Sequence, residues 1–185
     1  MADLADQEQD IRHVRRSLEN QLFYADIVNK YQAKILSFIR RISGVSQEEA
    51  EDIAQEIFLK AYVNLNNFDQ DKKFFSWLFS IAHNEVVSHW RKNKKRLKDV
   101  SIEGEELAER LGKENNLVEE IDLKVEKTEL KNAINKLNFK YREVLELKFI
   151  EDYSYQEISD IVKKPVATVG TLINRAKKQL KEIMK

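Results

Sequence analysis

The sequence predicts an all-α fold. It has only four glycines and one proline among its 185 residues, too few for the many turns of a β-rich chain. Apolar residues recur every three or four positions over long stretches, which is the spacing of a helix that buries one face. This spacing is lost over residues 97–126, which are rich in acids. We therefore expect two small helical domains, residues 1–96 and 127–185, joined by an acidic linker.

The location of the protein is restricted by what the sequence lacks. There is no cysteine, which excludes disulfides and thiolate metal sites and is compatible with a reducing compartment. The polar N-terminal stretch has no signal-peptide core, and no apolar run approaches the ~18 residues of a membrane-spanning helix. We expect a soluble, cytoplasmic protein that does not bind a membrane.

The charges balance overall but are segregated along the chain. Residues 91–98 contain six bases and no acid, and residues 99–129 contain eleven acids and four bases. Residues 163–185 contain seven bases and one acid. Two basic blocks that flank an acidic one indicate separate surfaces for separate partners.

The N-terminal half begins with helical spacing over residues 8–42, in a series that includes Leu18 and Leu22. Gly44 interrupts this series, and Ser46 followed by Glu49 is a capping-box pattern that predicts a new helix. The buried face of that helix leaves an acidic face outside, with one apolar member. The residues of this outer face are Glu51, Asp52, Gln55, Glu56 and Leu59. On spacing alone, solvation is the more common role of such a face.

An aromatic helix that runs into a basic block is the most unusual segment of the chain. Five aromatic residues precede or accompany the bases of residues 91–96: Phe74, Phe75, Trp77, Phe79 and Trp90. A helix that is apolar nearly all round is normally buried in a core. Aromatic rings interleaved with bases also suit single-stranded nucleic acid, because rings stack on unpaired bases and cations follow the phosphates. Both interpretations stay open at this level.

A helix-turn-helix is predicted over residues 153–180. Its first helix opens with the capping box of Ser154 and Glu157, and its second begins at Pro165, which suits a first helical turn. The second helix has one apolar stripe, formed by Val166, Val169, Ile173, Ala176 and Leu180. Its opposite face is polar and basic, and such a helix can lie in a DNA major groove. Two antiparallel core helices with a solvated basic face are the alternative.

Two regions of the sequence resemble bacterial RNA polymerase sigma factors of the extracytoplasmic-function (ECF) group. The segments EDIAQEIFLKAYVNLNNF and FSWLFSIAHNEVVSHWRKNKKR are similar to the promoter-melting domain of that group. The segment YREVLELKFIEDYSYQEISDIVKKPVATV is similar to its DNA-reading domain, and the two domains occur in the same order. The resemblance implies a transcription initiation factor that binds core RNA polymerase, recognises the minus-ten and minus-thirty-five promoter elements and promotes strand opening.

The resemblance also implies roles for particular residues. Glu51, Asp52, Gln55, Glu56 and Leu59 would dock on the clamp helices of the polymerase core. Phe68, the loop after it and Asn84 would capture a base flipped out of the minus-ten element. The full minus-ten set is Phe68, Lys72, Lys73, Asn84, Trp90, Arg91, Lys92, Lys95 and Arg96.

Recognition of the duplex minus-thirty-five element would fall to the last helix and the turn before it. The residues assigned to this element are Lys164, Thr168, Thr171, Asn174, Arg175 and Lys178. Arginine suits the paired acceptors of guanine and asparagine suits adenine. The chain departs from its relatives at Gly170, Thr171 and Leu172, where they commonly have a basic residue followed by Ser-Arg. Two cations are therefore missing.

No catalytic, metal or cofactor site is expected. The three histidines form no H-E-x-x-H motif, there is no Glu-x-x-His pair on two helices, and no glycine-rich phosphate loop occurs. The family implies core polymerase, promoter DNA and an anti-sigma factor as partners. Two alternatives from other classes are a helix-turn-helix regulator that acts without polymerase and a helical protein-interaction adaptor. Co-elution with core polymerase separates these alternatives from a sigma factor.

Overall fold

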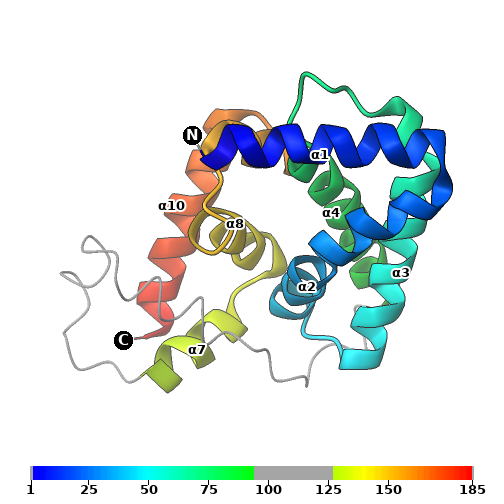
Figure 1. Ribbon diagram of the computed structural model, residues 1–185. Helices are drawn as coiled ribbons and strands as arrows, with labels where there is room; N and C mark the ends of the chain where they lie inside the picture. Colours follow the sequence, from blue (N-terminus) through cyan, green and yellow to red (C-terminus); the bar gives the residue numbers. More distant parts are fainter. Residues whose placement is uncertain (1, 94–126, 185) are drawn as a thin grey trace. The chain divides into compact units, whose positions relative to one another are not determined.

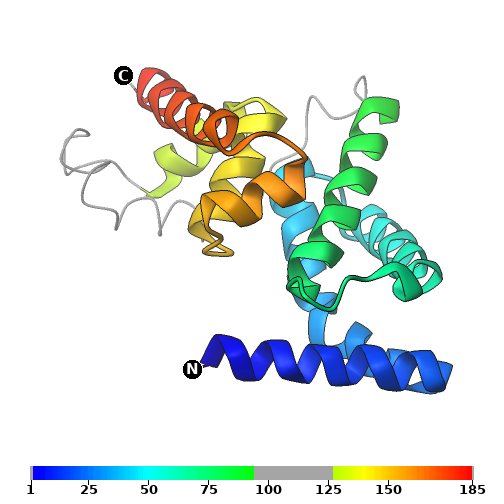
Figure 2. The same ribbon diagram turned by 90° about the horizontal axis from the view of Figure 1, so that it is seen from above.

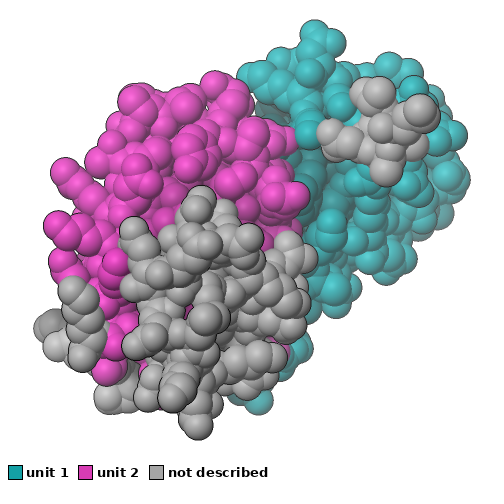
Figure 3. Space-filling model, turned by 90° about the vertical axis from the view of Figure 1, so that its left-hand side faces the viewer, with its two compact units in different colours: residues 1–39, 46–96 teal, residues 40–45, 97–185 magenta. Residues whose placement is uncertain are grey.

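The computed structural model describes residues 2–93 and 127–184, and every regular element in these ranges is a helix (Figure 1). The all-α prediction is confirmed. The chain divides into two compact units, residues 1–39 with 46–96 and residues 40–45 with 97–185 (Figure 3). The acidic linker predicted at 97–126 lies outside the described residues, so its boundaries stay a prediction.

The first unit is built mainly from long helices joined by two short 3-10 turns (Figures 1 and 2). Helix α3 packs along α4, and α1 contacts η1, η2 and α4. Gly44, with φ 69°, follows the end of α2, and the Ser46 hydroxyl accepts the Glu49 N–H at the start of α3. The elements are α1 (Ala2–Glu19), η1 (Gln21–Phe23), α2 (Tyr24–Ser43, of which residues 24–39 belong to this unit), α3 (Gln47–Val63), η2 (Leu65–Asn67) and α4 (Phe74–Asn93).

The helical series predicted over residues 8–42 is broken at Asn20. This residue is extended, with φ −148° and ψ 118°, and its side chain accepts the Leu22 N–H, which starts η1. Leu18 and Leu22 are members of the apolar series, but they do not join the core. The two side chains are exposed, Leu22 to 75%. A local asparagine cap therefore overrides the apolar spacing.

Seven aromatic rings form a continuous chain through the first unit. Their neighbouring centroids lie 4.2 to 5.8 Å apart, the range of favourable ring contacts. In order along the chain the rings are Phe38, Phe79, Phe75, Tyr31, Phe74 and then Phe68 with Trp77. Among these rings of α4, Phe74 and Phe79 are buried, as the core interpretation predicts, whereas Phe75 and Trp77 are half-buried. This ring chain joins α2, α4 and the segment between η2 and α4.

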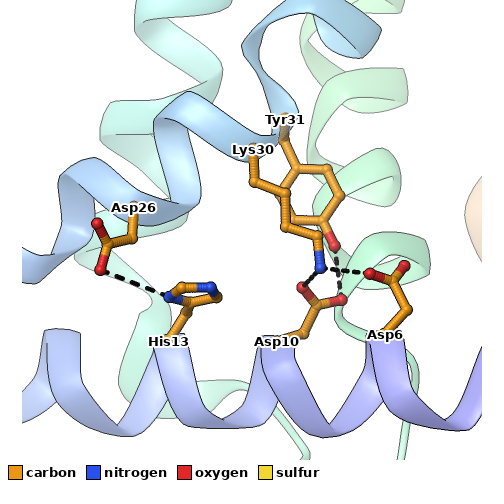
Figure 4. Close-up of polar contacts among 6 residues, drawn as sticks. All are labelled: Asp6, Asp10, His13, Asp26, Lys30 and Tyr31. Atoms are coloured by element: carbon orange, nitrogen blue, oxygen red, sulfur yellow. Dashed lines mark hydrogen bonds and ion pairs between the residues drawn. The ribbon is translucent and has the colours of Figure 1, made fainter.

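Helix α1 is attached to α2 by polar contacts (Figure 4). The Lys30 ammonium donates to Asp6 and to Asp10, each at 2.6 Å, and the Tyr31 hydroxyl donates to Asp10 at 2.5 Å. From Asp6 onward, Val14 is the one fully buried apolar side chain of α1. Burial acts to lower the pKa of Lys30, but the bonds to Asp10 and Asp6 outweigh it and raise this pKa. The ammonium therefore stays charged at neutral pH.

The second unit contains the predicted helix-turn-helix. Helices α7 (Lys127–Lys136), α8 (Phe139–Phe149) and α9 (Tyr155–Val162) pack with α10 (Val166–Ile183). Ser154 and Glu157 form the complete capping box. Lys163 ends α9 in the left-handed conformation, with φ 53° and ψ 48°. Pro165 is the N-cap of α10, one residue before the helix that it was predicted to begin.

The apolar stripe of α10 is confirmed at four of its five positions. Val169, Ile173, Ala176 and Leu180 are buried, whereas Val166 in the first turn is 37% exposed. The stripe faces α8 and α9, and this packing turns the other face of α10 toward solvent.

Asp10→Asn is expected to destabilise the protein by roughly 1–3 kcal/mol, because the buried side chain at residue 10 loses its charge-assisted bonds to Lys30 and Tyr31. Urea unfolding at neutral pH measures this change. The contribution of Lys30 is fully present below the ordinary lysine pKa of 10.5 and is lost as pH rises through its raised pKa. Glu8→Gln on the exposed side of α1 is the control, and equal stability of the two variants would contradict the assigned role of Asp10.

Candidate functional site

The outer face of α3 borders an open groove in the first unit. All five residues predicted for this face, from Glu51 to Leu59, are exposed. The groove has a volume of about 670 Å³. Its walls come from η1, α2 and α3, and its lining residues are Gln21, Leu22, Tyr24, Val28, Gln32, Leu36, Glu51, Ala54, Gln55, Phe58, Leu59 and Tyr62.

The groove is apolar inside and partly acidic at its edge. Leu22 and Leu59 are 75% and 57% exposed, and nearby Val63 is 67% exposed. An exposed apolar cluster of this kind marks a binding surface. Tyr24 stabilises the wall, because its hydroxyl donates to the Phe58 carbonyl at 2.7 Å and its ring meets Tyr62 edge-on at 5.0 Å. Burial raises the pKa of Tyr24, so the hydroxyl stays a donor.

The residues predicted to bind melted DNA differ in their exposure to solvent. Phe68 is only 6% exposed, because its ring packs against Phe74 at 5.2 Å and Trp77 at 5.4 Å. Its ring therefore supports the loop from inside and is not presented to solvent. Lys72 is exposed in that loop and Lys73 is half-buried.

One exposed polar strip runs along α4. Asn84, Ser88 and Arg91 lie on it at positions i, i+4 and i+7, and Lys92 is exposed beside them. Trp90 is half-buried. The last two residues assigned to this element, Lys95 and Arg96, lie outside the described residues.

Helix α10 presents its predicted polar face to solvent. Thr168, Thr171, Asn174, Arg175 and Lys178 are exposed on it, and Lys164 is exposed in the preceding turn. The Thr171 hydroxyl donates to the Ala167 carbonyl at 2.9 Å, which uses its proton within the helix.

A second, polar hollow lies within this unit between the start of α8 and the end of α10. It measures about 520 Å³ and collects three cations, Lys140, Arg175 and Lys178, beside one acid, Glu182. Lys140 was missed from the sequence, because it lies on a different helix from the predicted strip. The collected cations extend the positive surface beyond α10.

The described residues contain no group of His, Cys, Asp or Glu that could hold a metal ion. In the same ranges, none of the helices has the length and apolar character needed to cross a bilayer.

Comparison with known proteins identifies the family. Residues 27–96 match Sigma-70 region 2, and residues 127–180 match Sigma-70, region 4. The ECF RNA polymerase sigma factor SigW of Bacillus subtilis is 37% identical over 178 residues, and the match covers 93% of each chain. The chain belongs to the ECF sigma factors. The predicted resemblance is confirmed, and the protein is a transcription initiation factor.

Other relatives agree with this assignment. The RNA polymerase sigma-H factor of Pseudomonas aeruginosa is 34% identical to this ECF sigma factor, over 94% of this chain and 93% of its own. Among solved structures, CnrH in complex with the cytosolic domain of CnrY matches with a TM-score of 0.65 and 23% identity, over 94% of both chains. RpoE of Bartonella quintana, solved with the anti-sigma factor NepR, matches with a TM-score of 0.61 and 21% identity, over 86% of this chain and 95% of its own. These two structures support the fold.

In this sigma factor, the space around Gly170 is large enough for a side chain with a Cβ atom. A Cβ atom added there would lie 3.8 Å from Tyr155 Cε2, an ordinary van der Waals distance. The residue is in mid-helix and does not have a positive φ. Glycine is therefore not required by packing or by backbone conformation.

Gly170→Ala is expected to stabilise the protein by about 0.5–1 kcal/mol, because alanine loses less backbone entropy in a helix interior. Urea unfolding followed by circular dichroism measures the change. The matched control is Gly44→Ala, which should destabilise by about 1 kcal/mol because Gly44 has a φ of 69°. A loss of stability in Gly170→Ala would show that its Cβ is not accommodated beside Tyr155.

Proposed function

We propose that this sigma factor binds core RNA polymerase through the groove between η1, α2 and α3 and directs it to promoters with α4 and α10. The observation that carries the proposal is the exposed pair Leu22 and Leu59 at the edge of an open apolar groove. A regulator that binds only duplex DNA does not need this second surface.

The chemistry of the groove indicates the kind of surface that it accepts. Glu51, Asp52 and Glu56 place negative charge along the exposed face of α3, next to Leu59. A partner that is apolar at its centre and basic at its margin is complementary to this arrangement. We assign the clamp helices of the polymerase core to it, with Leu22 and Tyr62 added to the predicted docking residues.

Capture of the melted minus-ten strand is assigned to the loop of residues 68–73 and the strip on α4. The loop and Asn84 would hold the flipped base, while the buried Phe68 ring supports the loop. Arg91 and Lys92, exposed further along α4, would bind backbone phosphate. Contacts made only by the unpaired strand offset the few kcal/mol that unstacking costs, which favours strand opening.

The minus-thirty-five element is assigned to the exposed face of α10. Arg175 would read guanine and Asn174 adenine. Because the Thr171 hydroxyl proton is engaged by the Ala167 carbonyl, that residue would offer its methyl group to a thymine methyl. Lys164 and Lys178 would meet phosphate.

The proposal also extends to partners and location. The protein would act in the cytoplasm and catalyse no reaction itself. An anti-sigma factor is also proposed, since structures of the same fold were solved as complexes of CnrH with CnrY and of RpoE with the anti-sigma factor NepR.

Reconstitution with core polymerase tests the proposal. The mixture should co-elute in gel filtration and should transcribe a promoter that core polymerase alone ignores. A helix-turn-helix regulator without polymerase contacts, or an adaptor, would give neither result.

Asp52→Ala combined with Gln55→Ala is expected to weaken binding to core polymerase about tenfold or more, because both exposed side chains lie on the docking face of α3. Fluorescence anisotropy of a labelled protein measures the affinity, and circular dichroism checks that helicity is unchanged. Glu8→Ala with Gln9→Ala on the exposed side of α1 makes the same change of charge away from the groove. Wild-type affinity in the α3 double variant would reject the docking face.

Arg175→Ala is expected to reduce affinity for upstream duplex DNA by roughly 5- to 150-fold, the loss of one bidentate base contact. Binding to core polymerase should not change. Lys136→Ala, an exposed cation on α7, is the control for charge alone. A footprint that is the same for wild type and Arg175→Ala would count against base reading by this residue.

A further inference from the structure

We infer that Arg15 of α1 is a positioning residue that fixes the loop of residues 68–73 for base capture. The inference rests on the proposed function, which gives this loop its role at the minus-ten element. Helix α1 precedes the matched Sigma-70 region 2, which begins at residue 27. None of the predicted site residues lies on α1.

Arg15 reaches the loop with two nitrogens of its guanidinium group. Its Nε and Nη2 donate to Oε1 of Gln70 at 3.0 and 2.9 Å. The two residues are 55 positions apart in the sequence, so the contact joins α1 to the loop across the unit. A fork with two donors on one acceptor restricts the direction of the Gln70 side chain more than a single bond does.

Two further bonds within the loop are local. The Asp69 carboxylate accepts the Asp71 N–H at 3.1 Å, and the Asp69 carbonyl accepts the Lys72 N–H at 3.0 Å. These bonds shape a turn but do not fix its direction relative to the helices. Phe68 holds the start of the loop through its ring, and Arg15 holds its middle through Gln70.

Hydrogen bonds also attach helix α1 to the same aromatic core. Asp10 accepts from Lys30 and from Tyr31 (Figure 4). The Tyr31 ring stacks on Phe75 with centroids 5.2 Å apart. The Tyr31 ring also contacts Phe74, which in turn contacts Phe68. The Phe68 ring and the Arg15–Gln70 bonds therefore connect the loop to the same packed core. This arrangement pre-organises the loop before DNA arrives.

The neighbouring Arg12 provides a matched control. It lies on the same helix and carries the same charge, but it is exposed and makes no hydrogen bond or ion pair within the described residues of the chain. Replacing either arginine removes one positive charge from α1. Only replacement of Arg15 frees Gln70.

The test uses holoenzyme reconstituted with Arg15→Ala, Gln70→Ala, the double variant, Arg12→Ala and Arg15→Lys. Permanganate reactivity of minus-ten thymines measures the open complex, and anisotropy measures polymerase affinity. Arg15→Ala and Gln70→Ala should each reduce the open complex roughly three- to tenfold and reduce discrimination against substituted minus-ten bases. Polymerase affinity should stay constant. The double variant should be no worse than either single one, and Arg15→Lys should recover some of the loss.

Two results would overturn the inference. Arg15→Ala that behaves like Arg12→Ala would show that the bonds to Gln70 have no role in positioning. Effects of Arg15→Ala and Gln70→Ala that multiply in the double variant would show that Arg15 acts on DNA directly.

Hydrogen exchange in the free protein tests the inference separately from the proposed function. Exchange over residues 66–77 should be faster in Arg15→Ala and unchanged in Arg12→Ala. Equal exchange in the two variants would overturn the inference. A wild-type holoenzyme that opens no promoter would instead reject the proposed function, and the exchange result would still stand.

Discussion

The chain of seven aromatic rings is the interaction on which the first unit depends. It begins with Phe38 on α2, passes through the rings of α4, and ends at Phe68, next to the loop that we assign to base capture. Rings with centroids 4.2 to 5.8 Å apart pack densely and resist rearrangement. A surface that must hold a displaced base needs such a rigid support. The same rings leave the polar strip of α4 exposed for phosphate and base contacts.

The polar attachment of α1 gives this rigid core an outer support. Lys30, Asp10 and Tyr31 hold the helix at its centre, and Arg15 extends the attachment to Gln70. At the end of α1, the Arg16 guanidinium lies over the Phe23 ring, 3.9 Å from its centroid. Phe23 belongs to η1, which carries Leu22 at the edge of the groove. One helix therefore contacts elements beside both proposed interfaces of this unit.

The features of the fold that were predictable from the sequence are those set by neighbouring residues. The Ser154 and Glu157 pair marks the start of α9, and the apolar stripe from Val169 to Leu180 marks the buried face of α10, because both signals span a few helical turns at most. The exposed face of α3 follows from the same periodicity. The family resemblance then supplied roles that periodicity does not give.

The features that the sequence did not reveal depend on contacts between distant segments or on competition between local signals. The Asn20 cap interrupts an otherwise regular apolar series and exposes Leu22, a competition that spacing alone does not resolve. The burial of Phe68 follows from its contacts with Phe74 and Trp77, which need the tertiary structure. The groove is formed by three elements together, η1, α2 and α3. The bond from Arg15 to Gln70 joins residues that are 55 positions apart in the sequence.

The backbone of Lys163 has a consequence for heat tolerance. A non-glycine residue with φ 53° costs about 1 kcal/mol relative to glycine, which is the usual residue after a helix end. Here a lysine occupies that position and adds its charge to that of Lys164, directly before the helix assigned to DNA. At this turn, glycine would raise the melting temperature, whereas lysine strengthens the attraction to a polyanion.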